Sequence, residues 1–456
     1  MYRPLFTAAI ALATVASAGA RAETLEQALI STYLNNPNIL GERANLRSVD
    51  EGVPQALSGW RPTVTFTGAI GDEESENTPP APPNAPAHQT FQPHTYSLTL
   101  TQPVYNGGGT IAKTAQAEDL VQSERAKLVA VESTAFMAAV QSYFDVLQNQ
   151  QVVELDRNNE AVLGRQLEAT NDQFRVGQVT RTDVAQAESR LAAATATRQQ
   201  DQGTLEVSRS NYTLAVGHPP VDLVQPTLHP FIPATRDEAL TLAATKNPNI
   251  VAAQFSEVAA RDNVAQVEAQ LLPSISIVGN VQRLQETLIN GRETTNRSVL
   301  AQLNLPLYEG GNIWSQSRQA IENVGKAKGA TDETRRQSVQ TATQAWETIQ
   351  SARASITSLQ STIRAAQIAL DGVTQQQQVG ARTVLDVLNA QQELFSDQVS
   401  LVKAQHDLSV AEFNLTSQVG NLTAVDLKLD VPLYDADIHY RSVRNKLLGL
   451  HADDGH

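Results

Sequence analysis

One nine-residue motif occurs twice in the sequence, and each copy lies between two long helical patterns. The motif reads V-G-x-x-T-x-x-D-V at 176–184 and again at 379–387, so that Gly177 and Gly380 are 203 positions apart. Glycine favours the left-handed conformation that ends a helix, and the threonine that follows, Thr180 or Thr383, is suited to cap the next helix. Each copy therefore predicts a tight turn between antiparallel helices, and the chain is an internal duplication.

The duplication sets the expected organisation of the 456 residues. We expect two repeats, a proline-rich linker between them and a C-terminal tail, at 23–217, 234–420, 218–233 and 421–456, respectively. Each repeat should contain short helices, then a β-hairpin, then a long antiparallel helical hairpin. The expected strands lie at 62–70 and 94–102, and at 273–282 and 297–305. The expected long helices lie at 110–175 and 180–216, and at 312–378 and 383–419. The predicted fold class is mostly α with a small β part.

The spacing between the repeats shows where the chain tolerates insertion. The N-P-N motif at 36–38 recurs at 247–249 with an offset of 211, whereas from Pro103 to Gly217 the offset is 203. The first strand-to-strand loop is therefore longer by 211 − 203 = 8 residues, and its acidic and proline-rich segment 71–93 is expected to be a mobile loop without regular structure of its own. The long hairpins keep one length, which indicates that they pack side by side in a fixed register.

The first helix of the second hairpin has the most regular apolar pattern. Its apolar residues alternate spacings of three and four, which is a heptad repeat and predicts supercoiling with a neighbouring helix. These residues are Ala342, Ala345, Ile349, Ala352, Ile356, Leu359, Ile363, Ala366, Leu370 and Val373. A long amphipathic helix in an ordinary bundle explains the stripe equally well.

The N-terminus and the composition restrict where the chain works. Residues 1–22 contain Arg3, an apolar run and then small residues, which is typical of a secretory signal peptide. The mature chain is expected to begin near Glu23. The formal net charge of −14 gives no electrostatic reason to bind nucleic acid. Because the chain has no cysteine, disulfides, thiolate zinc sites and a cysteine nucleophile are excluded.

No pattern in the sequence points to catalysis. The eight histidines are scattered, and no pair has metal-ligand spacing on a helix. The run Gly107-Gly108-Gly109 follows an expected strand but lacks the G-x-G-x-x-G spacing of a nucleotide-binding turn. We therefore expect no enzyme activity, no metal and no cofactor.

The four expected strands alternate apolar residues with Ser, Thr, Gln or Asn. Val64 and Phe66 alternate with threonines, and Ile275 and Ile277 alternate with serines. This pattern is typical of outer-membrane strands, although a half-buried soluble sheet gives the same alternation. Four strands are too few to close, and an open edge is unstable in lipid. Two chains give an eight-stranded barrel filled by side chains, whereas three give twelve strands and a passage. We therefore expect a homotrimer in outer-membrane lipid.

Together these features resemble the TolC-type outer-membrane channel family over essentially the whole mature chain. The resemblance is carried by the paired N-P-N motifs, by the duplicated tips, and by the turns P-V-Y-N-G-G and P-L-Y-E-G-G at 103–108 and 306–311. The segment around 420–446 is similar to that of type I secretion members. The resemblance implies a trimeric twelve-stranded barrel continued by an α-helical periplasmic tunnel. It also implies a periplasmic adaptor (membrane fusion) protein and an inner-membrane pump of ABC, RND or MFS type as partners in exporting small molecules or proteins.

The same resemblance implies roles for individual residues. Arg382 and Asp183 match an ionic lock between the hairpins, and Asp386 matches an aspartate ring at the constriction of the tunnel. The turns at the tips are expected to contact the adaptor through Gly177, Thr180, Gly380 and Thr383.

Two positions depart from the family pattern. Gln377 stands where a tyrosine of the lock is expected, and Asn389 stands where a second constriction aspartate is expected. Taken as residues alone, Asp183 and Asp386 also suit the stabilisation of helix N-termini. Two other functions stay open: a soluble periplasmic coiled-coil adaptor, and a structural stalk or adhesin without a pore.

Overall fold

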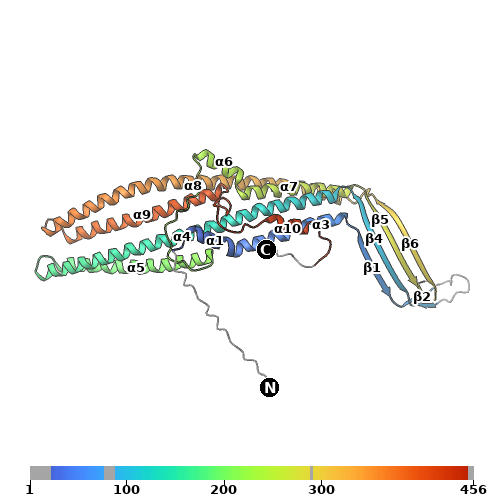
Figure 1. Cartoon of the computed structure of the whole chain (residues 1–456), viewed down its shortest axis with the longest axis horizontal. Helices are drawn as coiled ribbons and strands as arrows, with labels where there is room; N and C mark the ends of the chain where they lie inside the picture. Colours follow the sequence, from blue (N-terminus) through green and yellow to red (C-terminus); the bar gives the residue numbers. More distant parts are fainter. Residues whose placement is uncertain (1–21, 77–87, 288–290, 450–456) are drawn as a thin grey trace, which may run out of the picture.

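The structure is a computed structural model that describes residues 22–76, 88–287 and 291–449. The expected signal peptide lies outside the described residues, apart from Ala22. The molecule is an elongated helical rod with a β-sheet at one end (Figure 1). Its helices are α1 (Leu25–Asn35), α2 (Pro37–Asp50), α3 (Gly52–Leu57), α4 (Gly109–Arg175), α5 (Arg181–Val216), α6 (Arg236–Lys246), α7 (Pro248–Glu268), α8 (Asn312–Gln378), α9 (Val384–Gln418) and α10 (Ala436–Val443).

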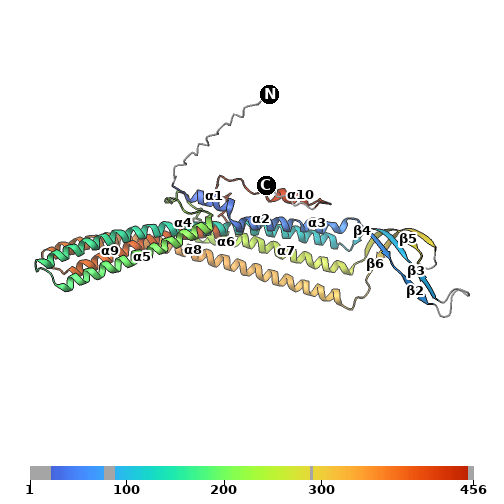
Figure 2. The ribbon, with the colours of Figure 1, turned by 90° about the horizontal axis from the view of Figure 1, so that it is seen from below.

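Two long helical hairpins, one in each repeat, form the rod. The outgoing helices α4 and α8 have 67 residues each, which is about 100 Å at 1.5 Å per residue. Each turns back into a helix about half as long, the 36-residue α5 or the 35-residue α9. The two tips lie together at the end of the rod that is farthest from the sheet (Figures 1 and 2). The chain is thus mostly helical with a small β part, as the sequence predicts.

A four-stranded antiparallel sheet joins the two repeats. Its strands are β1 (Thr63–Ile70), β4 (His94–Asn106), β5 (Ser274–Gln285) and β6 (Glu293–Asn304), in the order β1-β4-β5-β6. The central pair, β4 with β5, brings together one strand of each repeat. β1 and β6 are therefore the two edges of the sheet.

The strands differ from the sequence expectation in three places. β4 continues past the expected end at 102, through Pro103, and its register against β5 shifts between Pro103 and Tyr105. A proline has no N–H to donate to the ladder, so an irregularity at this point is expected. β6 begins at Glu293 rather than near 297.

The segment 71–93 is the third difference, because the expected irregular loop contains regular structure. β2 (Glu73–Glu76) and β3 (His88–Phe91) form a separate antiparallel ribbon beyond the main sheet. Backbone pairing holds this ribbon, together with the His88–Glu76 ion pair at 3.8 Å and the buried Phe91, so its acidic composition does not prevent it. The proline-rich part of this segment lies outside the described residues.

The repeated N-P-N motifs connect helices end to end. In each copy the first asparagine caps the helix that starts at the proline, since its side chain accepts from the N–H of Asn38 or Asn249. The same side chain donates to a carbonyl at the end of the long hairpin in its own repeat. Asn36 reaches Ala215 at the end of α5, and Asn247 reaches Gln418 at the end of α9, each at 3.1 Å. α2 and α7 thus begin where α5 and α9 end.

The heptad residues of α8 face the second hairpin's own core. Ala342, Ala345 and Ile349 are buried against Ala411 and Leu415 of α9, in one cluster with residues of α6. The seam residues from Ile356 to Val373 are half-buried in the single subunit. The neighbour that the heptad pattern predicts is therefore supplied by α9 and α6 within the chain.

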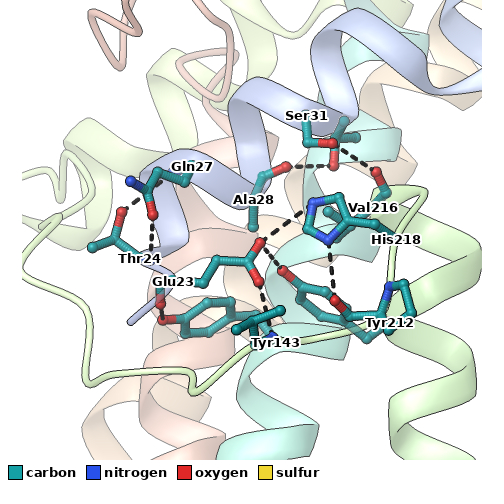
Figure 3. A network of polar contacts seen from close by, with 12 residues as sticks. Glu23, Thr24, Gln27, Ala28, Ser31, Tyr143, Tyr212, Val216 and His218 are labelled. Atoms are coloured by element: carbon teal, nitrogen blue, oxygen red, sulfur yellow. Dashed lines mark hydrogen bonds and ion pairs between the residues drawn. The ribbon is translucent and has the colours of Figure 1, made fainter. Parts of the chain in front are cut away.

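Glu23, the residue expected near the start of the mature chain, is buried in a polar network at the base of the first hairpin (Figure 3). The Tyr143 hydroxyl donates to its backbone carbonyl at 2.9 Å, and the Tyr212 hydroxyl donates to its carboxylate at 2.6 Å. Burial raises the pKa of Tyr143 to about 12, and burial together with the bond to Glu23 raises the pKa of Tyr212. Both hydroxyls therefore stay protonated and continue to donate.

The same network holds the linker between the repeats. The Val221 N–H donates to the Glu23 carboxylate at 3.3 Å, and the His218 imidazole lies 3.5 Å from that carboxylate. Backbone bonds join Glu23 to Val221 and Val224. Glu23 and the linker thus form one unit with α4 and α5.

The C-terminal segment is part of the folded core rather than an appendage. Leu422, Ala424 and Leu429 are buried in the same apolar cluster as the residues of α1, α4 and α5. Farther along, α10 lies on α2, where the His439 ring is 2.9 Å from the Asp50 carboxylate and both side chains are buried. The C-terminal segment therefore connects the N-terminal helices α1 and α2 with α4 and α5 in the middle of the rod.

Candidate functional site at the hairpin tips and the sheet

The two tips have the same backbone geometry. Gly177 and Gly380 have φ values of +76° and +77°, which is the left-handed region that glycine adopts without strain. The bonds Gln178 N–H to Gln173 O and Gly177 N–H to Phe174 O form a Schellman motif at the end of α4. Equivalent bonds close α8, at the same positions of the second repeat. The duplicated motif therefore specifies two matched turns.

The aspartates of both tips close the first turn of the returning helices. Thr180 accepts from the Asp183 N–H, and the Asp183 carboxylate accepts from the Thr180 N–H at 2.8 Å and from its hydroxyl at 2.7 Å. Thr383 and Asp386 repeat this reciprocal capping box. The bonds from Thr383 lower the pKa of Asp386, which is partly exposed, and the charge of Arg382 acts in the same direction.

In a single subunit the residues expected to form the ionic lock each bond within their own hairpin. Asp183 is engaged by Thr180, and Arg382 donates through Nε to the Gln376 side chain at 3.3 Å. The helix-capping interpretation of Asp183 and Asp386 thus describes what these groups do within one chain. A constriction around an axis requires further subunits.

Two other side-chain bonds join the hairpins near the tips. Gln377 on α8 donates to Gln173 on α4 at 3.3 Å. Arg190 on α5 donates to Asn389 on α9 at 3.0 Å. Beside these bonds, an apolar cluster contains residues of both hairpins: Leu163, Ala187, Ala194, Val384 and Leu388. The two positions that depart from the expected family pattern, Gln377 and Asn389, therefore both contact the other hairpin.

Sequence reasoning missed Gln173 and Arg190 as partners in these contacts. Both are polar residues on long, largely exposed helices, where most polar side chains face solvent. Their partners lie about two hundred positions away in the chain. The mismatches at Gln377 and Asn389 were the only signal of an altered contact, and they gave no information about which residues had replaced the expected partners.

At the other end of the rod, the sheet has one apolar and one polar face. Residues directly opposite in the register share a face, so Val64, Leu100 and Val299 lie in line across the strands, with Gly279 between the last two. The other face carries Thr65, Thr99, Asn280 and Ser298 in line. The Asn280 amide donates to the Thr99 hydroxyl at 2.9 Å.

The apolar face of the sheet is uncovered. Val64, Phe66 and Val299 are 63%, 68% and 78% exposed, whereas apolar side chains of this size are mostly buried in soluble domains. Arg283 and Arg297 lie on the same face, nearer the loops. Within the described part of the chain, none of the helices is both long enough and apolar enough to cross a bilayer.

The arrangement of long hairpins and an uncovered sheet matches a known family. The family model described as outer membrane efflux protein matches residues 25–218 and 239–421. The chain belongs to the outer membrane efflux protein family. The two matched ranges coincide with the two repeats, and the linker lies between them.

Individual relatives extend over nearly the whole chain. The outer membrane efflux protein BepC of Brucella suis biovar 1 is 33% identical over 456 residues, which cover 99% of this chain and 98% of the relative. The outer membrane protein TolC of Escherichia coli is 24% identical and covers 89% of this chain, with 84% of the relative. The solved structure of the Campylobacter jejuni CmeC outer membrane channel superposes with a TM-score of 0.77 at 14% identity, covering 93% of this chain and 89% of the other.

These comparisons confirm the resemblance to TolC-type channels. As a member of this family, the chain is an outer-membrane channel that serves as an exit duct for export. The sheet is the part built for the membrane, and the helical rod is the periplasmic part. The family consists of channel proteins, not enzymes.

Proposed function

We propose that three copies of this chain close their open sheets into one twelve-stranded barrel, through which export cargo leaves the cell. The single observation that carries this proposal is the four-stranded sheet with one uncovered apolar face, one polar face and two free edges. In lipid, β1 of one subunit must pair with β6 of the next, because unpaired backbone groups are costly there. The polar face then lines the lumen and the apolar face meets the lipid.

The number three follows from the size of the passage. Eight strands leave an interior that side chains fill, whereas larger barrels enclose a channel. Twelve strands from three subunits give a lumen, and the six helical hairpins that accompany them continue it as a periplasmic tunnel. The subunits are identical, so the assembly is a closed ring with threefold symmetry.

The hairpin tips form the periplasmic gate of this tunnel. Asp386, Asp183 and Arg382 are placed at the tips, where three copies of each residue surround the axis. Three carboxylates around one axis focus negative potential and favour cations. In the closed state Arg382 of one hairpin pairs with Asp183 of a neighbouring hairpin, whereas in the single subunit each side chain bonds within its own hairpin.

The tip turns also receive the rest of the export machinery. A periplasmic adaptor protein contacts the turns, through Gly177, Thr180, Gly380 and Thr383, and brings an inner-membrane pump of the ABC, RND or MFS type to the tunnel. Support comes from the exposure of these turns and from the repetition of their motif and glycine conformation, which presents two similar docking positions per subunit. Conduction through the duct is passive, and the pump supplies the energy and selects the cargo.

Deleting the gene and restoring it tests the function. We expect the deletion to raise sensitivity to toxic small molecules or to abolish release of a secreted protein, and we expect the intact gene to restore the loss. Purified protein should give stepwise conductance in planar bilayers. A purified, folded protein without conductance, in a strain without either export defect, would favour an adaptor or a stalk without a pore.

A further inference from the structure

A histidine bridges the two hairpins between their tips and their base. His406 lies on α9, and its Nε2 is 2.7 Å from a carboxylate oxygen of Asp145 on α4. Its Nδ1 is 3.0 Å from a carboxylate oxygen of Asp407, the next residue on α9. An ionised carboxylate only accepts hydrogen bonds, so both ring nitrogens can donate only when the imidazole carries two protons. The geometry therefore fits the charged form of His406.

The polar side chains that line the cavity beside His406 are uncharged. The His406 side chain is 13% exposed, and it lies at a cavity of about 420 Å³ whose other polar side chains are neutral: Gln148, Gln151, Gln225, Gln405 and Ser409. Asp145 from α4 and Asp407 from α9 are the charged groups that act on the ring. The linker contributes the neutral Gln225. None of these other cavity-lining residues is a basic side chain that could supply the positive charge when His406 loses its proton.

Because the chain is duplicated, each residue of the bridge has an equivalent position in the other repeat. The residues that make the bridge are present at only one of these two sets of positions. At the repeat offset of 203, Asp145 corresponds to Thr348, His406 to Gly203 and Asp407 to Thr204. In a ring of hairpins, α4 meets α9 inside a subunit, and the equivalent contact between subunits joins α8 to α5. That second contact has neither the histidine nor the carboxylates. The bridge therefore distinguishes the joint inside a subunit from the joint between subunits.

We propose that His406 is a proton-dependent joint that holds the two hairpins of one subunit together while its ring is charged and loosens them when the ring loses a proton. The loosening is confined to the α4–α9 contact. The tips, which are far from the joint along α4, swing apart by more than the helices do at the joint itself. As the tips form the gate only under the proposed function, an effect on conduction rests on that proposal, whereas the joint itself does not.

The electrostatics agree with this geometry. Burial lowers the pKa of His406, but the hydrogen bonds and charges of Asp145 and Asp407 outweigh it and raise the pKa above 6.5. A raised pKa means that the joint is at full strength below pH 6.5 and is lost as the pH rises through the folded-state pKa. Alkaline conditions above the raised pKa therefore weaken the joint.

The absence of cysteine allows a direct test on the full-length protein in detergent. Spin labels at Gln178→Cys and Ala381→Cys, which are exposed in the two tip turns, report the distance between the hairpins. We expect a narrow distance distribution at about pH 6 and a broader, longer one at about pH 9, a range that brackets histidine titration. In His406→Gln the distribution should be broad at both pH values.

Two carboxylate variants separate a joint from a merely structural contact. Asp145→Asn removes the charge on the other hairpin and should abolish the pH response. Asp407→Asn removes a charge on the same helix, so the response should remain and move to lower pH. His229→Gln in the exposed linker is a control that should behave as the unsubstituted protein. If distances in the unsubstituted protein do not change with pH, or if His406→Gln and Asp145→Asn both keep the response, the joint is refuted.

Conductance measured on the same variants then addresses the gate alone. If the open probability rises with pH in the unsubstituted protein and this rise disappears in His406→Gln, the joint controls the gate. If the label distances change with pH but the conductance does not, the joint is supported and its role in the gate is refuted.

Discussion

Gln377 in the second hairpin donates a hydrogen bond to Gln173 in the first, with 3.3 Å between Nε2 and Oε1. Both side chains are uncharged, and they meet at the position where a channel of this family was expected to carry a tyrosine. The second departure, Asn389, accepts from Arg190 at 3.0 Å. The contacts between the tips of one subunit are therefore an amide pair and a single charge-assisted bond, beside a small apolar cluster.

Replacing Gln377 by alanine should favour the open gate. A neutral hydrogen bond contributes about 0.5–1.5 kcal/mol, so the loss shifts the equilibrium between closed and open tips by about two- to twelvefold in each subunit. Open probability in planar bilayers measures the shift. Gln378→Ala is the matched control, because Gln378 is the next residue and is exposed. Equal open probabilities in the two variants would show that the hydrogen bond between Gln377 and Gln173 does not hold the gate closed.

Asp386→Asn should reduce the preference for cations without unfolding the tip. An asparagine oxygen still accepts from the Thr383 N–H, so the capping box survives while the charge is lost. Because the pKa of Asp386 is lowered, the cation preference of the unsubstituted channel should persist when the pH falls to 3.8 and disappear only below it. Reversal potentials in a salt gradient measure the preference. Thr383→Ala keeps the charge but breaks the cap, and it should retain the preference if charge is the cause.

The tips show clearly how far the sequence determined the structure. The glycine and the threonine–aspartate pair of each motif act within a few residues, so Gly177, Thr180 and Asp183 predicted the turn and the helix start correctly. The alternation in the strands likewise predicted which residues share a face, because its period is that of the pleat. Local chemistry of this kind is readable from one sequence.

Contacts between distant helices could not be read in this way. His406 and Asp145 are 261 positions apart, and each is one polar residue among many on a long exposed helix. Which of them meet depends on the rotation of α9 about its axis relative to α4, and a single sequence leaves that rotation open. The ribbon formed by 73–76 and 88–91 was missed for another reason: its backbone pairs without the apolar pattern that identifies a strand.

Gly380→Val should impair export more than Gly380→Asn. The φ of +77° costs an L-residue roughly 1–2 kcal/mol, and β-branched residues suffer most there, whereas asparagine tolerates this conformation. Apart from Gly380 and its two chain neighbours, no described atom lies within 4 Å of an added Cβ, so the difference reports local backbone strain and not a clash with packed neighbours. Export assays and hydrogen exchange at the tip compare the variants, and the same order should hold at Gly177. Equal export by the valine and asparagine variants would contradict this explanation.

Asp156→Asn should stabilise the first hairpin at pH 8 and leave it unchanged near pH 4. Asp156 is 2% exposed, and burial, with the nearby Asp201 carboxylate, raises its pKa to about 7. Since this pKa lies above the unfolded value of 3.8, the chain loses stability as the pH rises from 3.8 through about 7. The asparagine variant lacks that loss. Melting temperatures across this pH range measure it.

An exposed acid provides the control for the Asp156 prediction. Asp371 lies on the surface of α8, so Asp371→Asn removes one negative charge without changing a buried group. If both substitutions change the melting temperature equally at pH 8, net charge explains the effect and the buried carboxylate does not.

The central claim is that four strands per chain become a pore only when three chains share one barrel. Native mass spectrometry of the folded protein, extracted in detergent and shown to conduct in bilayers, tests this most directly. We expect a complex of three chains, with the backbone amides of both β1 and β6 protected from hydrogen exchange. A conducting species of one or two chains would contradict it.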